Sequence, residues 1–159
     1  MTGVLDLFEA HFLVTDLNAA VDFYREVVGL RLAHVTAAGD AAFMWIGEAR
    51  QAMLGLWACG PAPLRVTSHA AFRTSVADVM AAPPMLRTAG VTPLDFSGRP
   101  TDAPVVLAWM PAAAVYFRDP DGNLLEFIAM LPEQPRPDLG VLPWRMWQFI
   151  HQPAAAHAS

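Results

Sequence analysis

The chain has 159 residues, 55% of them hydrophobic, and a formal net charge of −5. Because no apolar run approaches the roughly 18 residues of a membrane span and no basic run is present, we expect neither a membrane nor a nucleic acid as partner. A single cysteine, Cys59, excludes an internal disulfide framework, and the amino terminus lacks the pattern of a secretory signal, so we expect a cytoplasmic protein.

The first elements in chain order are a strand, a helix and a second strand. The strand is predicted over 11–16, and Gly29 ends the helix that follows it. The next strand is predicted over 30–35. The helix is indicated by four apolar residues at the spacing of one helical face: Leu17, Val21, Tyr24 and Val28.

A second copy of this pattern begins 58 residues after His11, at His69. We predict a strand over 69–74, a helix from Val76 to Thr88, and a further strand from Val91 to Phe96 after Gly90. In both copies a histidine leads a strand, a helix follows, and a glycine ends it. Internal similarity at this period indicates a duplicated supersecondary unit.

Each copy also closes with a comparable strand. The segment 52–57 aligns with 123–128, so that Gly55 holds the place that Glu126 holds in the second copy. The turn before the second of these strands, Asp119-Pro-Asp-Gly-Asn123, has the residue types of a hairpin turn, because proline presets φ and glycine accepts a positive φ. Each unit is therefore predicted to be βαβββ.

These features together resemble the vicinal oxygen chelate superfamily, which includes glyoxalase I, the fosfomycin-resistance proteins, the extradiol dioxygenases and the bleomycin-binding proteins. The similarity covers roughly residues 8 to 131. It implies an α+β fold of two βαβββ modules that form a curved, cup-shaped mixed sheet with the helices outside. We expect one domain over 1–131, with module one at 8–60 and module two at 65–131.

The resemblance implies that His11, His69 and Glu126 bind one divalent metal ion (Zn, Ni, Mn or Fe), because in such families the ligands come from the first and last strands of each module. Strand alternation is consistent with this, since Glu9, His11 and Leu13 share a face. Gly55 departs from glyoxalase I, where this strand supplies a fourth ligand, a carboxylate. A two-histidine, one-carboxylate site leaves positions free for substrate.

The same residues have a plainer interpretation. A histidine in an apolar strand is more often a hydrogen-bonded core residue, and Glu126 could be an edge-strand charge. An unpaired buried carboxylate is unfavourable, however, and a metal is an efficient partner for it. The other three histidines hold no matching place in the repeat and are interpreted as non-ligands: His34, His151 and His157.

A large apolar lining is predicted for the cup, and it favours a hydrophobic small-molecule substrate. The second copy carries an insertion of 13 residues in the segment from Ser97 to Ala114. The aromatic residues could equally form core and a dimer interface. The expected pocket residues are Phe43, Trp45, Trp57, Trp109 and Tyr116. The candidate anion contacts are Arg65, Arg73 and Arg118, each also a common type of surface residue.

The chain has no lysine, which excludes Schiff-base chemistry. The fosfomycin-resistance proteins that it resembles use lysine around the phosphonate, so the resemblance argues against fosfomycin as the substrate, although arginine could replace lysine as an anion contact. The catalytic residues are unknown from the sequence. Glu126 would be a ligand and not a base, which leaves a metal-bound hydroxide, Tyr116 or Glu9 as candidate bases.

After the domain, four prolines predict an extended linker over 132–143. The segment 144–159 is expected to dock through its aromatic residues and then to fray.

Three functions remain open at this point. The first is a glyoxalase-like metalloenzyme with lyase, isomerase or transferase chemistry on a substrate that chelates the metal through neighbouring oxygens. The second is an extradiol-type dioxygenase containing iron. The third is a resistance protein that binds a hydrophobic drug or metabolite, with or without metal. The resemblance also implies a homodimer, with the modules paired within or between chains.

Overall fold

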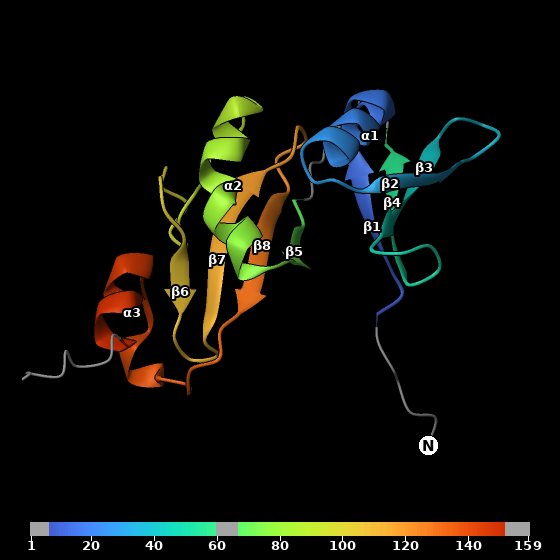
Figure 1. The fold of residues 1–159 in the computed structure, drawn as a ribbon. Coiled ribbons are helices and arrows are strands. Elements are labelled where there is room, and N and C mark those ends of the chain that lie inside the picture. The colour runs from blue at the N-terminus through green and yellow to red at the C-terminus, as the bar shows by residue number, and fades with distance from the viewer. Residues whose placement is uncertain (1–6, 60–66, 152–159) are drawn as a thin grey trace, which may run out of the picture. The chain divides into compact units, whose positions relative to one another are not determined.

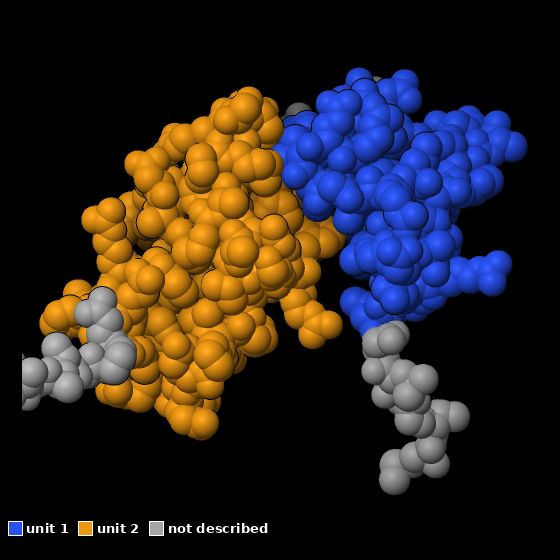
Figure 2. Space-filling model, in the orientation of Figure 1, with its two compact units in different colours: residues 1–68, 118–123 blue, residues 69–117, 124–159 orange. Residues whose placement is uncertain are grey.

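The computed structural model describes residues 7–59 and 67–151. The chain divides into two compact units, which Figure 2 distinguishes by colour. Unit 1 comprises Met1–Ser68 and Arg118–Asn123, and unit 2 comprises His69–Phe117 and Leu124–Ser159. Within the described residues, none of the helices has the length and apolar character needed to cross a membrane.

Unit 1 contains the first βαβββ module (Figure 1). Its elements are β1 (Glu9–Val14), α1 (Leu17–Glu26), β2 (Arg31–Val35), β3 (Ala41–Ile46) and β4 (Ala52–Ala58). The strands form a sheet in the order β1-β4-β3-β2, in which β1 runs parallel to β4 and the other neighbours are antiparallel. The first and last strands of the module are therefore adjacent.

The helix α1 covers one face of this sheet. The side chain of Asp16 caps it by accepting a hydrogen bond from the Ala19 N–H at 3.0 Å, and Gly29 ends the turn after it with a φ of +83°. Ala20 and Tyr24 are the buried helical residues. On the strands, alternate residues are buried in the core: Phe12, Val14, Ala42, Met44, Leu54 and Leu56.

Unit 2 contains the second module, followed by three additional elements (Figure 1). Its elements are β5 (His69–Arg73), α2 (Val76–Thr88), β6 (Val105–Leu107), β7 (Ala112–Arg118), β8 (Leu124–Met130), the 3₁₀ helix η1 (Pro137–Leu139), β9 (Val141–Pro143) and α3 (Trp144–His151). The sheet order is β5-β8-β7-β6-β9. The predicted α+β class and the two βαβββ modules are thus confirmed, and α2 has the bounds that the sequence predicts.

The prediction of a strand from Val91 to Phe96 is wrong. Only Leu94 forms β-bridges there, one of them to Tyr116 of β7, while Val105 in β6 pairs with Ala114, the next position on the same face of β7. Leu94 and β6 therefore pair along the same edge of β7, and residues 95–104 interrupt the pairing between them. The interruption arises because the Asp95 carboxylate accepts the N–H groups of the residues that follow it, which closes a turn instead of continuing a strand.

The segment predicted as an extended linker, 132–143, contains η1 and β9. Strand β9 pairs antiparallel with β6, Leu142 being opposite Val106, and so extends the sheet by one strand. Helix α3 follows directly and packs through Trp147, which is 1% exposed, against a cluster that includes Val106, Ala108 and Leu142. The carboxy-terminal part of the described chain is therefore integral to unit 2.

Candidate functional site

The structure brings His69 and Glu126 together on one face of the sheet of unit 2. Strands β5 and β8 are parallel neighbours, and the register sets His69 opposite Leu124 and Ala71 opposite Glu126. Nε2 of His69 lies 3.3 Å from Oε2 of Glu126. Nδ1 of the same ring lies 3.0 Å from the carbonyl oxygen of Leu124. A proton on Nδ1 donated to that carbonyl leaves Nε2 as the free ligand nitrogen, which is the usual arrangement of a metal-binding histidine.

Glu126 is a buried carboxylate, only 4% exposed, and its Oε1 has no hydrogen-bond partner among the described residues. Burial raises the pKa of the Glu126 carboxyl above its ordinary value, while Tyr116 and His69 act in the opposite direction. An unpaired buried carboxylate oxygen is unfavourable unless a cation or a donor satisfies it. A divalent cation fits this oxygen and the neighbouring His69 nitrogen.

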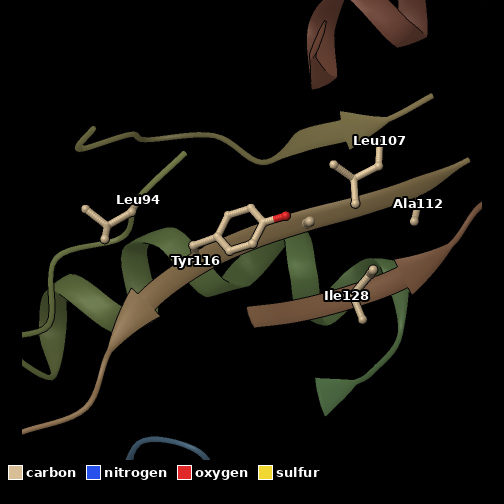
Figure 3. Close-up of a cluster of buried hydrophobic side chains, with 6 residues drawn as sticks. Leu94, Leu107, Ala112, Tyr116 and Ile128 are labelled. Carbon is tan, nitrogen blue, oxygen red and sulfur yellow. The ribbon is translucent and has the colours of Figure 1, made fainter. Parts of the chain in front are cut away.

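Tyr116, one of the candidate bases, lies beside this pair. Its ring centroid is 6.3 Å from that of His69, and burial together with the nearby Glu126 carboxylate raises the pKa of its phenol. The phenol therefore stays protonated at neutral pH, so that it is suited to donate a hydrogen bond and not to act as a base. Figure 3 shows Tyr116 within the apolar cluster of unit 2. The buried members of this cluster are Leu94, Leu107, Ala112, Ala114, Tyr116 and Ile128.

His11 lies in unit 1, on the sheet face that α1 does not cover. The register sets it opposite Gly55 of β4, which is opposite Phe43 of β3, so the three residues form one row across the sheet. The His11 ring contacts Phe43 and Trp57, with centroid distances of 6.1 and 5.8 Å. Its Nε2 lies 2.9 Å from Oε1 of Glu9, two residues earlier on the same strand.

Gly55 has a structural role that the sequence alone did not reveal. A Cβ placed at this position would lie 2.6 Å from Cδ2 and 3.0 Å from Nε2 of His11. These distances are shorter than van der Waals contact, so any side chain at position 55 would displace the imidazole. The position that lacks a carboxylate is therefore also the position that admits the His11 ring.

The predicted pocket residues fall into two groups. Phe43 and Trp45 share the uncovered face of unit 1, as their spacing of two predicts, and the strand register places Trp57 on the same face. The rings of Phe43 and Trp57 meet edge to face at 6.2 Å. Tyr116 belongs to unit 2. Trp109 lies in the turn between β6 and β7 and is 55% exposed, and the cluster around Tyr116 includes its neighbour Met110 instead.

Further residues singled out in the sequence also lie in the described chain, among them Arg118, Arg73 and His34. Arg118 donates to the carbonyl of Gly122 at 2.8 Å within its own turn, and Arg73 is an exposed residue of β5. His34, interpreted as a non-ligand, stacks on Phe43 at 6.4 Å. Arg65 and His157 lie outside the described residues.

The described residues thus contain two histidine–carboxylate pairs, each within its own unit: His11 with Glu9, and His69 with Glu126. Across 7–59 and 67–151, no group of three or more His, Cys, Asp or Glu side chains is assembled around a common point. From the sequence, Glu9 is a candidate base that shares a strand face with His11, and not a predicted partner of its ring. The signal that could have identified it as a partner is its position two residues before His11 on a strand.

Comparisons with known proteins agree with this architecture. The family described as the Glyoxalase/Bleomycin resistance protein/Dioxygenase superfamily matches residues 7–127. A search of curated proteins gave no match.

Solved structures with the same fold include an integron cassette protein, HFX_CASS4, from the mobile metagenome of the Halifax Harbour sewage outfall. It is 28% identical with a TM-score of 0.67, and the match covers 80% of this chain and 100% of that one. Lactoylglutathione lyase from Agrobacterium tumefaciens is 22% identical with a TM-score of 0.62, covering 80% and 95%. The fosfomycin resistance protein FosX from Mesorhizobium loti is 20% identical with a TM-score of 0.56, covering 83% and 96%. The last two similarities concern the fold alone.

Proposed function

Because the chain belongs to the Glyoxalase/Bleomycin resistance protein/Dioxygenase superfamily, we propose that it is a metalloenzyme in which His11, His69 and Glu126 bind one divalent metal ion. The observation that carries the proposal is the buried Glu126 carboxylate, whose Oε1 has no partner in the described chain and whose Oε2 lies 3.3 Å from Nε2 of His69. A bound divalent ion would supply Lewis-acid stabilisation of negative charge on a substrate with two neighbouring oxygens.

The roles of the chain's own residues follow from their environments. His69 is oriented by its hydrogen bond to Leu124, and Glu126 serves as an anionic ligand and not as a base. Tyr116 keeps its proton and can donate a hydrogen bond to the Glu126 carboxylate beside it. Phe43 and Trp57 supply a water-excluding aromatic surface next to His11, which favours a hydrophobic substrate.

The reaction class that we propose is glyoxalase-like lyase, isomerase or transferase chemistry in the cytoplasm, carried out by a homodimer.

Mixing His11→Ala with Glu126→Ala subunits tests whether the ligands of one metal site come from one chain or from two. Restored activity in the mixed dimer means that the ligands of one site come from two chains, whereas an inactive mixture means that they come from one.

The first experiment is elemental mass spectrometry of the untagged protein. We expect about one divalent metal per chain in the wild type and a large loss in Glu126→Gln, which keeps the shape of the side chain but not its charge. The matched control is Glu48→Gln, an exposed glutamate paired with Arg31 at 3.3 Å, which should retain the metal. A wild-type protein that takes up no metal after reconstitution contradicts the proposal.

The apolar face of unit 1 also favours a second candidate, a binding protein for a hydrophobic drug or metabolite. Leu13 and Trp57 are paired neighbours on this face and are 51% and 36% exposed, and adjoining exposed apolar side chains of this kind can mark a surface for a ligand or partner. Tight ligand binding by metal-free protein would favour this function. Iron in the purified protein, together with oxygen uptake on catechols, would favour an extradiol-type dioxygenase.

A further inference from the structure

The geometry of unit 1 points to Glu9 as an additional protein ligand, bound to the same metal ion as His11. This inference rests on the proposed function, because it assigns a further residue to that site. Glu9 and His11 are two residues apart on β1 and therefore project from the same face of the strand. Oε1 of Glu9 lies 2.9 Å from Nε2 of His11, and the two side chains are 31% and 49% exposed.

The separation of these two atoms is suited to shared coordination. Nitrogen and oxygen ligands lie about 2.1 Å from a divalent transition metal, so two ligands at a right angle to each other are about 3.0 Å apart. The observed distance of 2.9 Å agrees with this value. The same distance is that of a hydrogen bond, so a cation can replace the shared proton without moving either side chain by a large amount.

Gly55 explains why the imidazole can take this position. A side chain there would occupy the space of Cδ2 and Nε2 of His11, the nitrogen that faces Glu9. The uncovered face of unit 1 therefore combines a glycine beneath the ring with a carboxylate at its Nε2 edge. The glycine thus leaves room for Nε2, which is the ring nitrogen nearest the Glu9 carboxylate.

The duplicated modules provide an independent observation. In unit 2 the leading histidine of β5 meets a carboxylate from β8, with 3.3 Å between Nε2 of His69 and Oε2 of Glu126. In unit 1 the strand equivalent to β8 is β4. Its Gly55 lies directly opposite His11, whereas Glu126 lies opposite Ala71, two residues after His69. The leading histidine of unit 1 meets a carboxylate from its own strand instead. Each module thus presents one imidazole and one carboxylate, although the second carboxylate comes from a different strand.

The test uses the full-length metal-free protein titrated with Co²⁺, whose electronic absorption spectrum reports the number and type of its ligands. The variants are Glu9→Gln, Glu9→Asp and, as the control of equal charge change in the same unit, Glu48→Gln. We expect Glu9→Gln to weaken Co²⁺ binding at least about ten-fold and to change the spectrum. Glu9→Asp keeps the charge but shortens the side chain, so it should change the spectrum as well. Glu48→Gln should do neither.

The outcomes separate the two proposals. A Glu9→Gln protein with wild-type spectrum, whatever its affinity, overturns the assignment of Glu9 as a ligand and leaves the site of His11, His69 and Glu126 intact. A wild-type protein that binds no Co²⁺ overturns the proposed function and this inference with it. Circular dichroism of each variant establishes that the fold is retained, and His11→Ala, which removes the shared imidazole, should weaken binding in either case.

Discussion

The imidazole of His11 occupies the space that a side chain at position 55 would fill, since a Cβ there would lie 2.6 Å from its Cδ2. The two residues lie opposite each other in the parallel pairing of β1 and β4. Gly55 therefore affects the site in two ways. It supplies no carboxylate ligand, and it leaves the space that the His11 ring occupies.

Replacing Gly55 with alanine is expected to reduce metal affinity by roughly 10- to 100-fold, because the new methyl group displaces the His11 ring from its position beside Glu9. The measurement is competition with a chelator of known affinity. A second measurement compares the effect of Gly55→Ala on the free energy of unfolding in the wild type and in a His11→Ala background. Without the imidazole the clash is absent, so the lower backbone entropy of unfolded alanine should make Gly55→Ala neutral or stabilising by about 0.5–1 kcal/mol. Equal stability effects in both backgrounds would contradict the clash.

Replacing Tyr24 with phenylalanine is expected to destabilise unit 1 by about 1–3 kcal/mol. The phenol of Tyr24 is buried and donates a hydrogen bond to Oδ2 of Asp119 at 2.9 Å, which connects α1 to the turn 118–123 of the same unit. Urea unfolding followed by circular dichroism measures the change. In an Asp119→Ala background the Tyr24→Phe substitution should lose most of its effect, and an unchanged effect there would show that another contact is responsible.

Alkaline pH is expected to unfold the protein as its tyrosines ionise. Burial is the main cause that raises the pKa of Tyr24, and the Asp119 carboxylate adds to it. Burial and the Glu126 carboxylate raise the pKa of Tyr116 in the same way, so both tyrosines of the chain are affected. Since the folded state holds these protons more tightly than the unfolded chain, the stability is fully present below about pH 10 and falls as the pH rises further. Tyrosinate absorbance and loss of circular dichroism should therefore appear together. Tyrosinate formed near pH 10 in a folded protein would contradict this prediction.

Truncating Trp147 to alanine is expected to destabilise unit 2 by about 3–5 kcal/mol, because this side chain of α3 is 1% exposed and packs against Val106 and Leu142. Phe149→Ala, on the same helix but 74% exposed, is the matched control and should change stability by less than about 0.5 kcal/mol. Thermal unfolding of both variants provides the measurement. Similar effects in the two variants would mean that α3 is not held through Trp147.

Local signals were sufficient for the elements that short-range chemistry encodes. The helix from Val76 to Thr88 begins after Ser75, whose side chain caps it by accepting the Asp78 N–H at 3.1 Å, and Gly90 follows its end with a φ of +76°. These interactions involve neighbours in sequence, so they can be read from residue types and spacing. The repeat of histidine, helix and glycine identified both modules for the same reason.

The sequence by itself determined the two modules, their leading histidines and the shared face of Glu9 and His11, because these follow from the periodicity of strands and helices. The tertiary structure decided where Leu94 and β6 pair, how β9 extends the sheet, and that Gly55 lies opposite His11. Those features depend on strand register between segments far apart in the chain. Register is set by the packing of whole faces and by the turns between them, so no short stretch of sequence contains it.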